Sequence, residues 1–206
     1  MTFGATSLGA QASPVRFGIE AGAASAALVG DDAVYTDRRL SPFLGVTAIT
    51  QRPGSSIGFQ SGIQLVSKGA SFDEEGFEGA LRLRYLEVPL LLRFAPALAG
   101  SRLQPAVTVG GAMGLRIGCS VAFSGEGISG SVDCDDAENT EGADLKRFEA
   151  GVVVGAELGI PYRQRFLVVP MIRYTRGLTK IADSDTGDDD VRNSVIQVGV
   201  GLRFRQ

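Results

Sequence analysis

Apolar and polar residues alternate with a period of two along most of this 206-residue chain. In the C-terminal segment SVIQVGVGLRF, Ile196, Val198 and every second residue after them are apolar, whereas Gln197 and Arg203 occupy positions between them. Successive side chains of a β-strand point to opposite faces, so this period is typical of strands with one apolar face. The same alternation recurs in VRFGIEAG, SIGFQSGIQLV, PAVTVGGAMGLRIG, RFEAGVVVGAELGI and RFLVVPMIRYTRGL.

The most apolar run, YLEVPLLLRF (residues 85–94), follows the same rule although it contains two charged residues. Glu87 and Arg93 belong to one face with Tyr85 and Leu91, and the opposite face is purely aliphatic and aromatic. That apolar face consists of Leu86, Val88, Leu90, Leu92 and Phe94. Pro89 cannot donate a hydrogen bond to a neighbouring strand, so we expect a β-bulge or local strain there, and likewise at Pro170.

The pattern predicts eight strands, and the connectors between them alternate in character. The strands are expected near residues 15–27, 41–52, 55–68, 81–95, 104–122, 146–161, 165–180 and 194–205. The connectors QRPGSS, PALAGS and PYRQR are short, whereas VGDDAVYTDRR, GASFDEEGFEG, SGEGISGSVDCDDAENTEGAD and ADSDTGDDDVRN are long and acidic. With no internal repeat and no interdomain linker, this order is that of an up-and-down meander.

Alternation alone does not say which face is inside. A soluble barrel turns its apolar face inward, and an outer-membrane barrel turns it outward to lipid. Three features favour the second arrangement: a polar face rich in glycine, which a narrow lumen requires, alternating short and long connectors, and balanced charges on the polar face. The predicted lumen charges are Arg16, Arg93, Arg116, Arg173 and Arg203 against Glu20, Glu87, Glu149 and Glu157.

The sequence therefore predicts an all-β fold, an eight-stranded antiparallel transmembrane β-barrel with both termini in the periplasm. Glu87 and Arg93 suggest a gated pathway, but the favoured interpretation is a salt-bridge network that fills the lumen, since the interior of eight strands is just filled by side chains. Little or no open conduction is expected.

Composition and termini narrow the function. A net charge of -3 gives no basic field for nucleic acid. The chain has no His, the commonest general base and metal ligand. Residues 1–12, MTFGATSLGAQA, end in Ala10-Gln11-Ala12, and the remnant of a secretory signal peptide is favoured over a disordered leader, which leaves 13–206 as the barrel domain.

Four segments together resemble the PorT-type outer-membrane β-barrel family: YLEVPLLLRF, RFEAGVVVGAELGI, MIRYTRGLTKI and the terminal VGVGLRF. The resemblance implies an eight-stranded barrel that is exported and inserted into the bacterial outer membrane, in contact with its lipid and lipopolysaccharide. Members are often labelled porin-like, and the family has no catalytic residue set to transfer. With no Trp and only 4 Tyr, the aromatic girdles of this chain must be built largely from Phe.

Two cysteines lie close together in the sequence. Cys119 and Cys134 bracket a long connector. Without His they make a poor metal set, so an extracellular disulfide is favoured over redox or metal chemistry.

Acidic and basic connector residues are weaker candidates. Asp183, Asp185 and Asp189 in DSDTGDDD are a weak calcium candidate. Because the EF-hand spacing is absent, a solvated acidic loop is favoured, and the same holds for Asp133, Asp135 and Asp136. Arg82 and Arg84 are predicted on the outward face, where they either bind lipid phosphates or are solvated.

Three functions compete. The favoured one is a non-enzymatic outer-membrane barrel without a cofactor, which serves envelope structure or assembly and interacts with other envelope proteins through acidic loops. A lipid-modifying enzyme would need a nucleophile with a paired base, and a His-based pair is impossible here. A soluble lipocalin-like carrier of an apolar ligand requires the opposite facing, with Glu87 and Arg93 in water and Leu90 and Leu92 inside.

Overall fold

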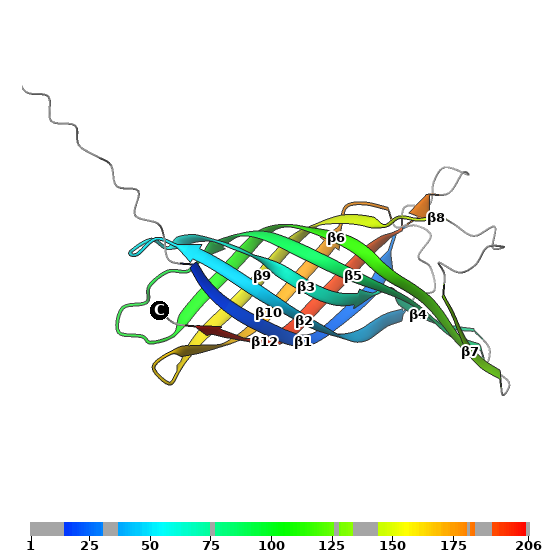
Figure 1. The fold of residues 1–206 in the computed structure, drawn as a ribbon, viewed down its shortest axis with the longest axis horizontal. Helices are drawn as coiled ribbons and strands as arrows, with labels where there is room; N and C mark the ends of the chain where they lie inside the picture. Colours follow the sequence, from blue (N-terminus) through cyan, green and yellow to red (C-terminus); the bar gives the residue numbers. More distant parts are fainter. Residues whose placement is uncertain are drawn as a thin grey trace, which may run out of the picture.

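The computed structural model describes residues 15–30, 37–74, 77–125, 128–133, 144–180, 182–183 and 191–204. The eight predicted strands are all present, as long tilted strands that run the length of the molecule (Figure 1). None of the described residues forms a helix long and apolar enough to cross a membrane. The strands are β1 Val15–Val29, β2 Asp37–Gln51, β3 Ile57–Lys68, β5 Phe77–Phe94, β6 Gln104–Gly125, β9 Phe148–Tyr162, β10 Phe166–Gly177 and β12 Arg192–Phe204.

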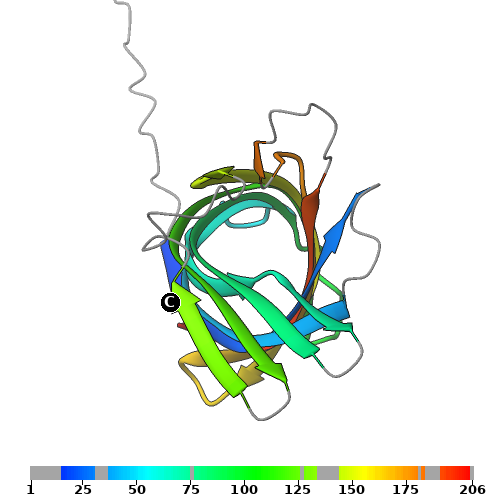
Figure 2. The ribbon, with the colours of Figure 1, turned by 90° about the vertical axis from the view of Figure 1, so that its right-hand side faces the viewer.

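These eight strands close into a ring. Each pairs antiparallel with its neighbours in the chain, from β1–β2 around to β10–β12. The first and last strands then pair with each other, from Gly18 opposite Arg203 to Val29 opposite Arg192. Figure 2 shows the closed ring from one end. The prediction of an eight-stranded, up-and-down antiparallel barrel is confirmed.

The two ends of the barrel differ. At the end that we call the short-turn end, residues 52–56, 95–103 and 163–165 connect the strands, and the C-terminal strand finishes there (Figure 1). At the opposite, long-loop end, short strands extend the sheet. There β4 (Ala70–Glu74) continues β3 after Gly69, whose φ is 114°. At the same end, β7 (Ile128–Asp133) folds back on β6, and β8 (Asp144–Leu145) pairs with β11 (Ala182–Asp183) in a separate two-stranded sheet.

The apolar face of the strands points outward. Leu90 and Leu92 are 41% and 53% exposed, whereas Glu87 and Arg93 are 3% and 4% exposed. A soluble carrier with an apolar interior requires the reverse. Apolar side chains point outward around the whole ring. The exposed large side chains include Ile19, Val46, Ile63, Val109, Met113, Val154, Ile172 and Val198.

Glycine leaves room in the lumen for a few large side chains. Gly22 on β1 lies opposite Gly199 on β12. The ring of Phe43, which is 3% exposed, covers this pair so closely that a Cβ on either glycine would lie less than 3 Å from it. Not all inward residues are polar, because Leu91, Ala112 and Val153 form a small apolar cluster inside the barrel.

The β-bulge that was one of the two expectations at the prolines is absent. Neither Pro89 nor Pro170 shifts the strand register. Instead, the β3–β5 ladder has no pairs between Ser61–Leu90 and Gln64–Glu87, and the β9–β10 ladder skips two positions at Pro170 in the same way. The missing N–H interrupts the ladder with one neighbour but does not insert a residue. The register shift in β5 lies at Arg84/Tyr85, on the β6 side.

Outward aromatic side chains gather at the short-turn end. Phe166 and Phe204 lie with ring centroids 5.4 Å apart at the ends of adjacent strands. The exposed side chains at the corresponding ends of β1, β3, β5 and β9 are Phe17, Phe59, Phe94 and Tyr162. Such a girdle is typical of the membrane–water interface, and it is built mostly from Phe, as the composition predicts.

The outward direction of the apolar face predicts that the same substitution has different effects on stability at two exposed leucines. Leu90→Arg, on the outward face of β5, should destabilise the barrel by about 2–4 kcal/mol, because it places a cation in the hydrocarbon band. Leu98→Arg is a matched control, since Leu98 is 48% exposed but lies in the connector 95–103. It should change stability by no more than about 0.5 kcal/mol. Urea unfolding of the protein in lipid vesicles measures both, and equal effects would contradict a lipid-facing Leu90.

Candidate functional site

The predicted lumen charges lie inside the barrel. Their positions share the inward parity of β1, β5, β6, β9, β10 and β12, so the alternation of the strands alone sets their direction. Arg16 and Arg116 are partly buried, one toward each end of the barrel. The other seven are between 2% and 6% exposed: Glu20, Glu87, Arg93, Glu149, Glu157, Arg173 and Arg203.

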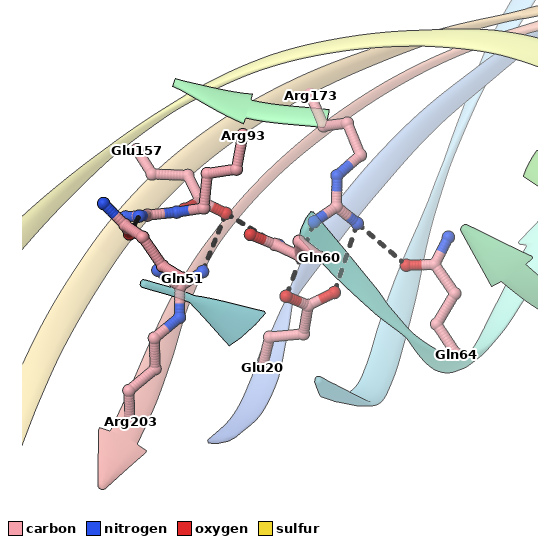
Figure 3. A network of polar contacts seen from close by, with 8 residues as sticks. All are labelled: Glu20, Gln51, Gln60, Gln64, Arg93, Glu157, Arg173 and Arg203. Carbon is pink, nitrogen blue, oxygen red and sulfur yellow. Dashed lines mark hydrogen bonds and ion pairs between the residues drawn. The ribbon is translucent and has the colours of Figure 1, made fainter. Parts of the chain in front are cut away.

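Near the short-turn end, the charges converge on Glu157 of β9. Arg203 Nη2 of β12 lies 2.7 Å from its Oε1, and Arg93 Nε of β5 lies 3.4 Å from its Oε2. The Gln60 amide of β3 donates a third hydrogen bond to Oε1 at 3.0 Å. One carboxylate therefore joins side chains from three other strands across the lumen (Figure 3).

At the middle of the barrel, Arg173 of β10 binds Glu20 of β1. Arg173 Nη1 donates to Glu20 Oε1 at 3.1 Å, and Nη2 donates to Oε2 at 3.5 Å. Arg173 Nη1 also reaches the amide oxygen of Gln64 on β3, at 3.2 Å (Figure 3). Paired N–H donors on one carboxylate hold both side chains in a defined orientation.

Toward the long-loop end, Lys68 lies between two carboxylates. Its ammonium contacts Glu87 and lies 2.9 Å from Glu149 Oε1. Asn193 donates to the other oxygen of Glu149 at 2.9 Å, and Gln64 donates to Glu87 at 2.6 Å. The ammonium also lies 5.0 Å from the centre of the Tyr85 ring. Gln64 therefore links this group to the Arg173–Glu20 pair.

The sequence prediction missed Lys68 as a lumen charge. Lys68 has the same parity as Gln60 and Gln64, which lie opposite the apolar face of the same strand. That signal was sufficient to find it, although it lies at the end of the predicted strand. Lys68 is 2% exposed and contacts two of the predicted glutamates.

The other predicted residues are only partly described. Cys119 is 1% exposed in β6, whereas Cys134 lies outside the described residues, so their disulfide stays a prediction. Arg82 and Arg84 are exposed on β5, as predicted. Of the acidic candidates, Asp133 is exposed in β7 and only the backbone of Asp183 is described; Asp135, Asp136, Asp185 and Asp189 lie outside the described ranges. Within those ranges no group of three metal-ligating side chains occurs.

Comparison with known proteins places the chain in a family. Residues 9–183 match the model of the outer membrane protein beta-barrel domain. The chain belongs to this family. It is an integral β-barrel protein of the bacterial outer membrane, and its apolar outer face and polar lumen are the arrangement that a lipid environment requires. A search of curated protein sequences gives no significant match.

Solved structures share the fold at low sequence identity. The outer membrane protein OprG from Pseudomonas aeruginosa is 16% identical, with a TM-score of 0.51, and the match covers 95% of this chain and 98% of that one. A major outer membrane protein from Thermus thermophilus is 14% identical, with a TM-score of 0.54, over 94% and 100% of the two chains.

The Lys68 contacts predict that this one cation holds the long-loop half of the lumen together. Lys68→Met leaves Glu87 and Glu149 without their buried cation, so it should destabilise the barrel by about 3–5 kcal/mol. Arg52→Met, in an exposed turn, removes a charge of the same sign and should change stability by no more than about 0.5 kcal/mol. If both variants lose equally little free energy of unfolding in urea, the result would contradict a stabilising role for the Lys68 ion pairs.

Proposed function

We propose that the protein is a non-enzymatic outer-membrane barrel with a closed lumen, which serves envelope structure or assembly and uses its acidic connectors as an interaction surface. The observation that carries this proposal is the charge network across the lumen. Its buried carboxylates each contact a cationic side chain: Glu20, Glu87, Glu149 and Glu157. Apart from the Lys68–Glu87 contact between adjacent strands, these ion pairs join strands that are not neighbours in the ring, so they brace the barrel across its interior.

A closed lumen follows from how the network spans the ring. The Arg173–Glu20 pair and the Glu157 group lie at successive levels, and both occupy the space that a water path would need (Figure 3). An eight-stranded barrel has an interior just wide enough for side chains. Since opening a path would separate buried ion pairs, we infer that the protein conducts few ions in its resting state.

The acidic connectors supply the proposed interaction surface. The chain has 23 Asp and Glu residues. Four of them are the lumen glutamates, and all the remaining 19 (23 minus 4) fall within residues 31–37, 73–78, 126–144 and 183–190, inside the four long connectors that the sequence predicts between strands at the long-loop end. We infer that this end faces the exterior and the short turns face the periplasm, as in other outer-membrane barrels.

Two finer assignments belong to the same proposal. We propose membership of the PorT-type group within the family, on the strength of the Tyr85–Phe94 run. Lipid and lipopolysaccharide would contact the apolar outer face, and the exposed Arg82 and Arg84 on β5 are positioned to bind their phosphates. Other envelope proteins would bind the acidic connectors.

A closed lumen predicts the absence of porin-like conductance. Purified protein inserted into planar lipid bilayers should give no stable current steps, whereas a large water-filled porin in the same membrane gives them and serves as the positive control. The mobility shift that folded barrels show on boiling in denaturing gels checks that the sample is folded, and recovery of the protein with lipid vesicles fused to the bilayer checks its incorporation. Discrete current steps from the wild-type protein would overturn the proposal of a closed lumen.

We also propose that Cys119 and Cys134 form a disulfide at the exterior. In the β6–β7 ladder, Ser120 lies opposite Asp133. Cys119 directly precedes Ser120 in the sequence and Cys134 directly follows Asp133, and directly opposed residues of antiparallel strands have Cβ atoms close enough for a disulfide. The bacterial outer membrane, where the barrel lies, adjoins an oxidising compartment.

Chemical labelling of these two cysteines tests both the disulfide and the side of the membrane that the long-loop end faces. Intact cells treated with a membrane-impermeant maleimide should show no labelling of the wild-type protein before reduction and clear labelling after an impermeant reductant. Reduction should also lower stability by about 3 kcal/mol, for a loop of about 15 residues. The Cys134→Ser variant controls for reactivity of the buried Cys119. Labelling without reduction would contradict the disulfide, and labelling only after the outer membrane is permeabilised would contradict the orientation.

A further inference from the structure

The short-turn end of the barrel contains a cavity that the structural role does not require. Its volume is about 1020 Å³. All three short connectors contribute to its wall, together with residues of β1, β2, β5, β6 and β9. We call this cavity the vestibule. Its volume is at the upper end of the range of small-molecule sites.

The charged residues that the structure describes in the vestibule are all arginines. Arg16 and Arg93 project from the barrel wall, and Arg52, Arg102 and Arg163 come from one connector each. No described Asp, Glu or Lys lines the vestibule. The three connectors, 52–56, 95–103 and 163–165, also contain no acidic residue. The described lining therefore combines five positive charges with no negative charge.

The positive charge of the inner wall is only partly neutralised. Arg16 Nη2 and Arg93 Nη1 both donate to the same amide oxygen, Gln51 Oε1, at 3.2 Å and 3.1 Å. Gln51 is neutral, and its own amide donates to the carbonyl oxygen of Ser55 at 2.6 Å. The carboxylate of Glu157 is shared between Arg93 and Arg203. Among the described residues, the inner end of the vestibule thus has three guanidinium groups, those of Arg16, Arg93 and Arg203, and a single carboxylate to neutralise them.

This arrangement differs from the rest of the lumen. Near the long-loop end, Lys68 contacts two carboxylates, and at the middle of the barrel Arg173 contacts Glu20. Within the part of the chain that the structure describes, no ion pair involves Arg16, Arg52, Arg102 or Arg163. The backbone of Arg163 has φ 54°, a left-handed conformation that glycine adopts more readily, so its place in the turn is not a relaxed one.

Uncompensated guanidinium groups on a concave wall select a particular ligand chemistry. Guanidinium donors match the oxygen geometry of carboxylates and phosphates, frequently through two parallel hydrogen bonds. A cleft lined by charge of one sign focuses its field and raises the local concentration of the opposite ion. Because the arginines come from separate segments around the cavity, one ligand that carries several anionic groups fits better than a single monovalent ion.

We propose that the vestibule binds a small anion that carries two or more phosphate or carboxylate groups. Arg16 and Arg93 contact the ligand from the inner wall, and Arg52, Arg102 and Arg163 contact it from the rim. The site lies on the short-turn side of the charge network, so it is a blind pocket and needs no open pore. Binding neutralises charge that the described part of the barrel leaves unmatched.

Titration calorimetry of the full chain in uncharged detergent, in about 0.15 M salt, tests this inference with tripolyphosphate and citrate as the ligands. At least one should bind saturably at one site per barrel. Tighter binding of tripolyphosphate indicates phosphate ligands, and tighter binding of citrate indicates carboxylate ligands. Arg16→Gln and Arg102→Gln should each weaken binding by about tenfold or more, which is the loss expected for one charge-assisted contact.

The matched control is Arg82→Gln, which removes an exposed arginine of β5 outside the vestibule. It should leave the affinity unchanged, and the gel mobility shift on boiling confirms that each variant is folded. Saturable binding that responds to Arg16 and Arg102 but not to Arg82 supports the site. Absence of saturable binding of both anions, or equal loss in all three variants, overturns it, because the attraction would then be to the general surface charge.

Discussion

The pairing of the first strand with the last is the interaction on which the rest of the structure depends. In lipid, an unpaired strand edge leaves backbone N–H and C=O groups without hydrogen bonds, and only closure removes both edges. The β1–β12 ladder, from Gly18 opposite Arg203 to Val29 opposite Arg192, provides that closure. Once the ring is closed, every side chain must face either lipid or a narrow interior, and the two-residue alternation of the sequence assigns each one.

The narrow interior accounts for both the glycines and the charges. A wide barrel can fill its lumen with water, but a ring of eight strands must fill it with side chains. Phe43 finds room only because Gly22 and Gly199 face it. The buried ion pairs are not a source of large net stability, since removing charges from water costs about as much as their attraction returns. We infer that they contribute specificity, because a misregistered strand would leave a charge such as Arg173 without its partner.

The sequence predicted the fold and the facing because both depend on strand parity, which is local. Parity placed Glu20, Glu87 and Arg93 inside, and it was sufficient for Lys68 as well. Strand parity could not predict which charges pair with each other, because Arg173 and Glu20 are 153 positions apart and meet only through the ring geometry. Pro89 shows the same limit: its missing N–H was foreseen, but whether the chain bulges or merely skips ladder bonds depends on the neighbouring strands. The vestibule escaped notice because its five arginines lie on separate segments that only the closed barrel brings together.

The shared contacts of the lumen also constrain how such a chain can change over evolutionary time. Lys68 contacts Glu87 and Glu149, and Glu157 contacts Arg93 and Arg203, so neither Lys68 nor Glu157 has a single partner. A lineage that loses Lys68 carries two buried carboxylates without the cation that they share until further substitutions follow. Lumen charges should therefore change in linked groups among related barrels, while the outward Leu, Val and Ile positions exchange freely with one another. We therefore expect the interior, and not the lipid-facing surface, to limit the pace of sequence divergence in such barrels.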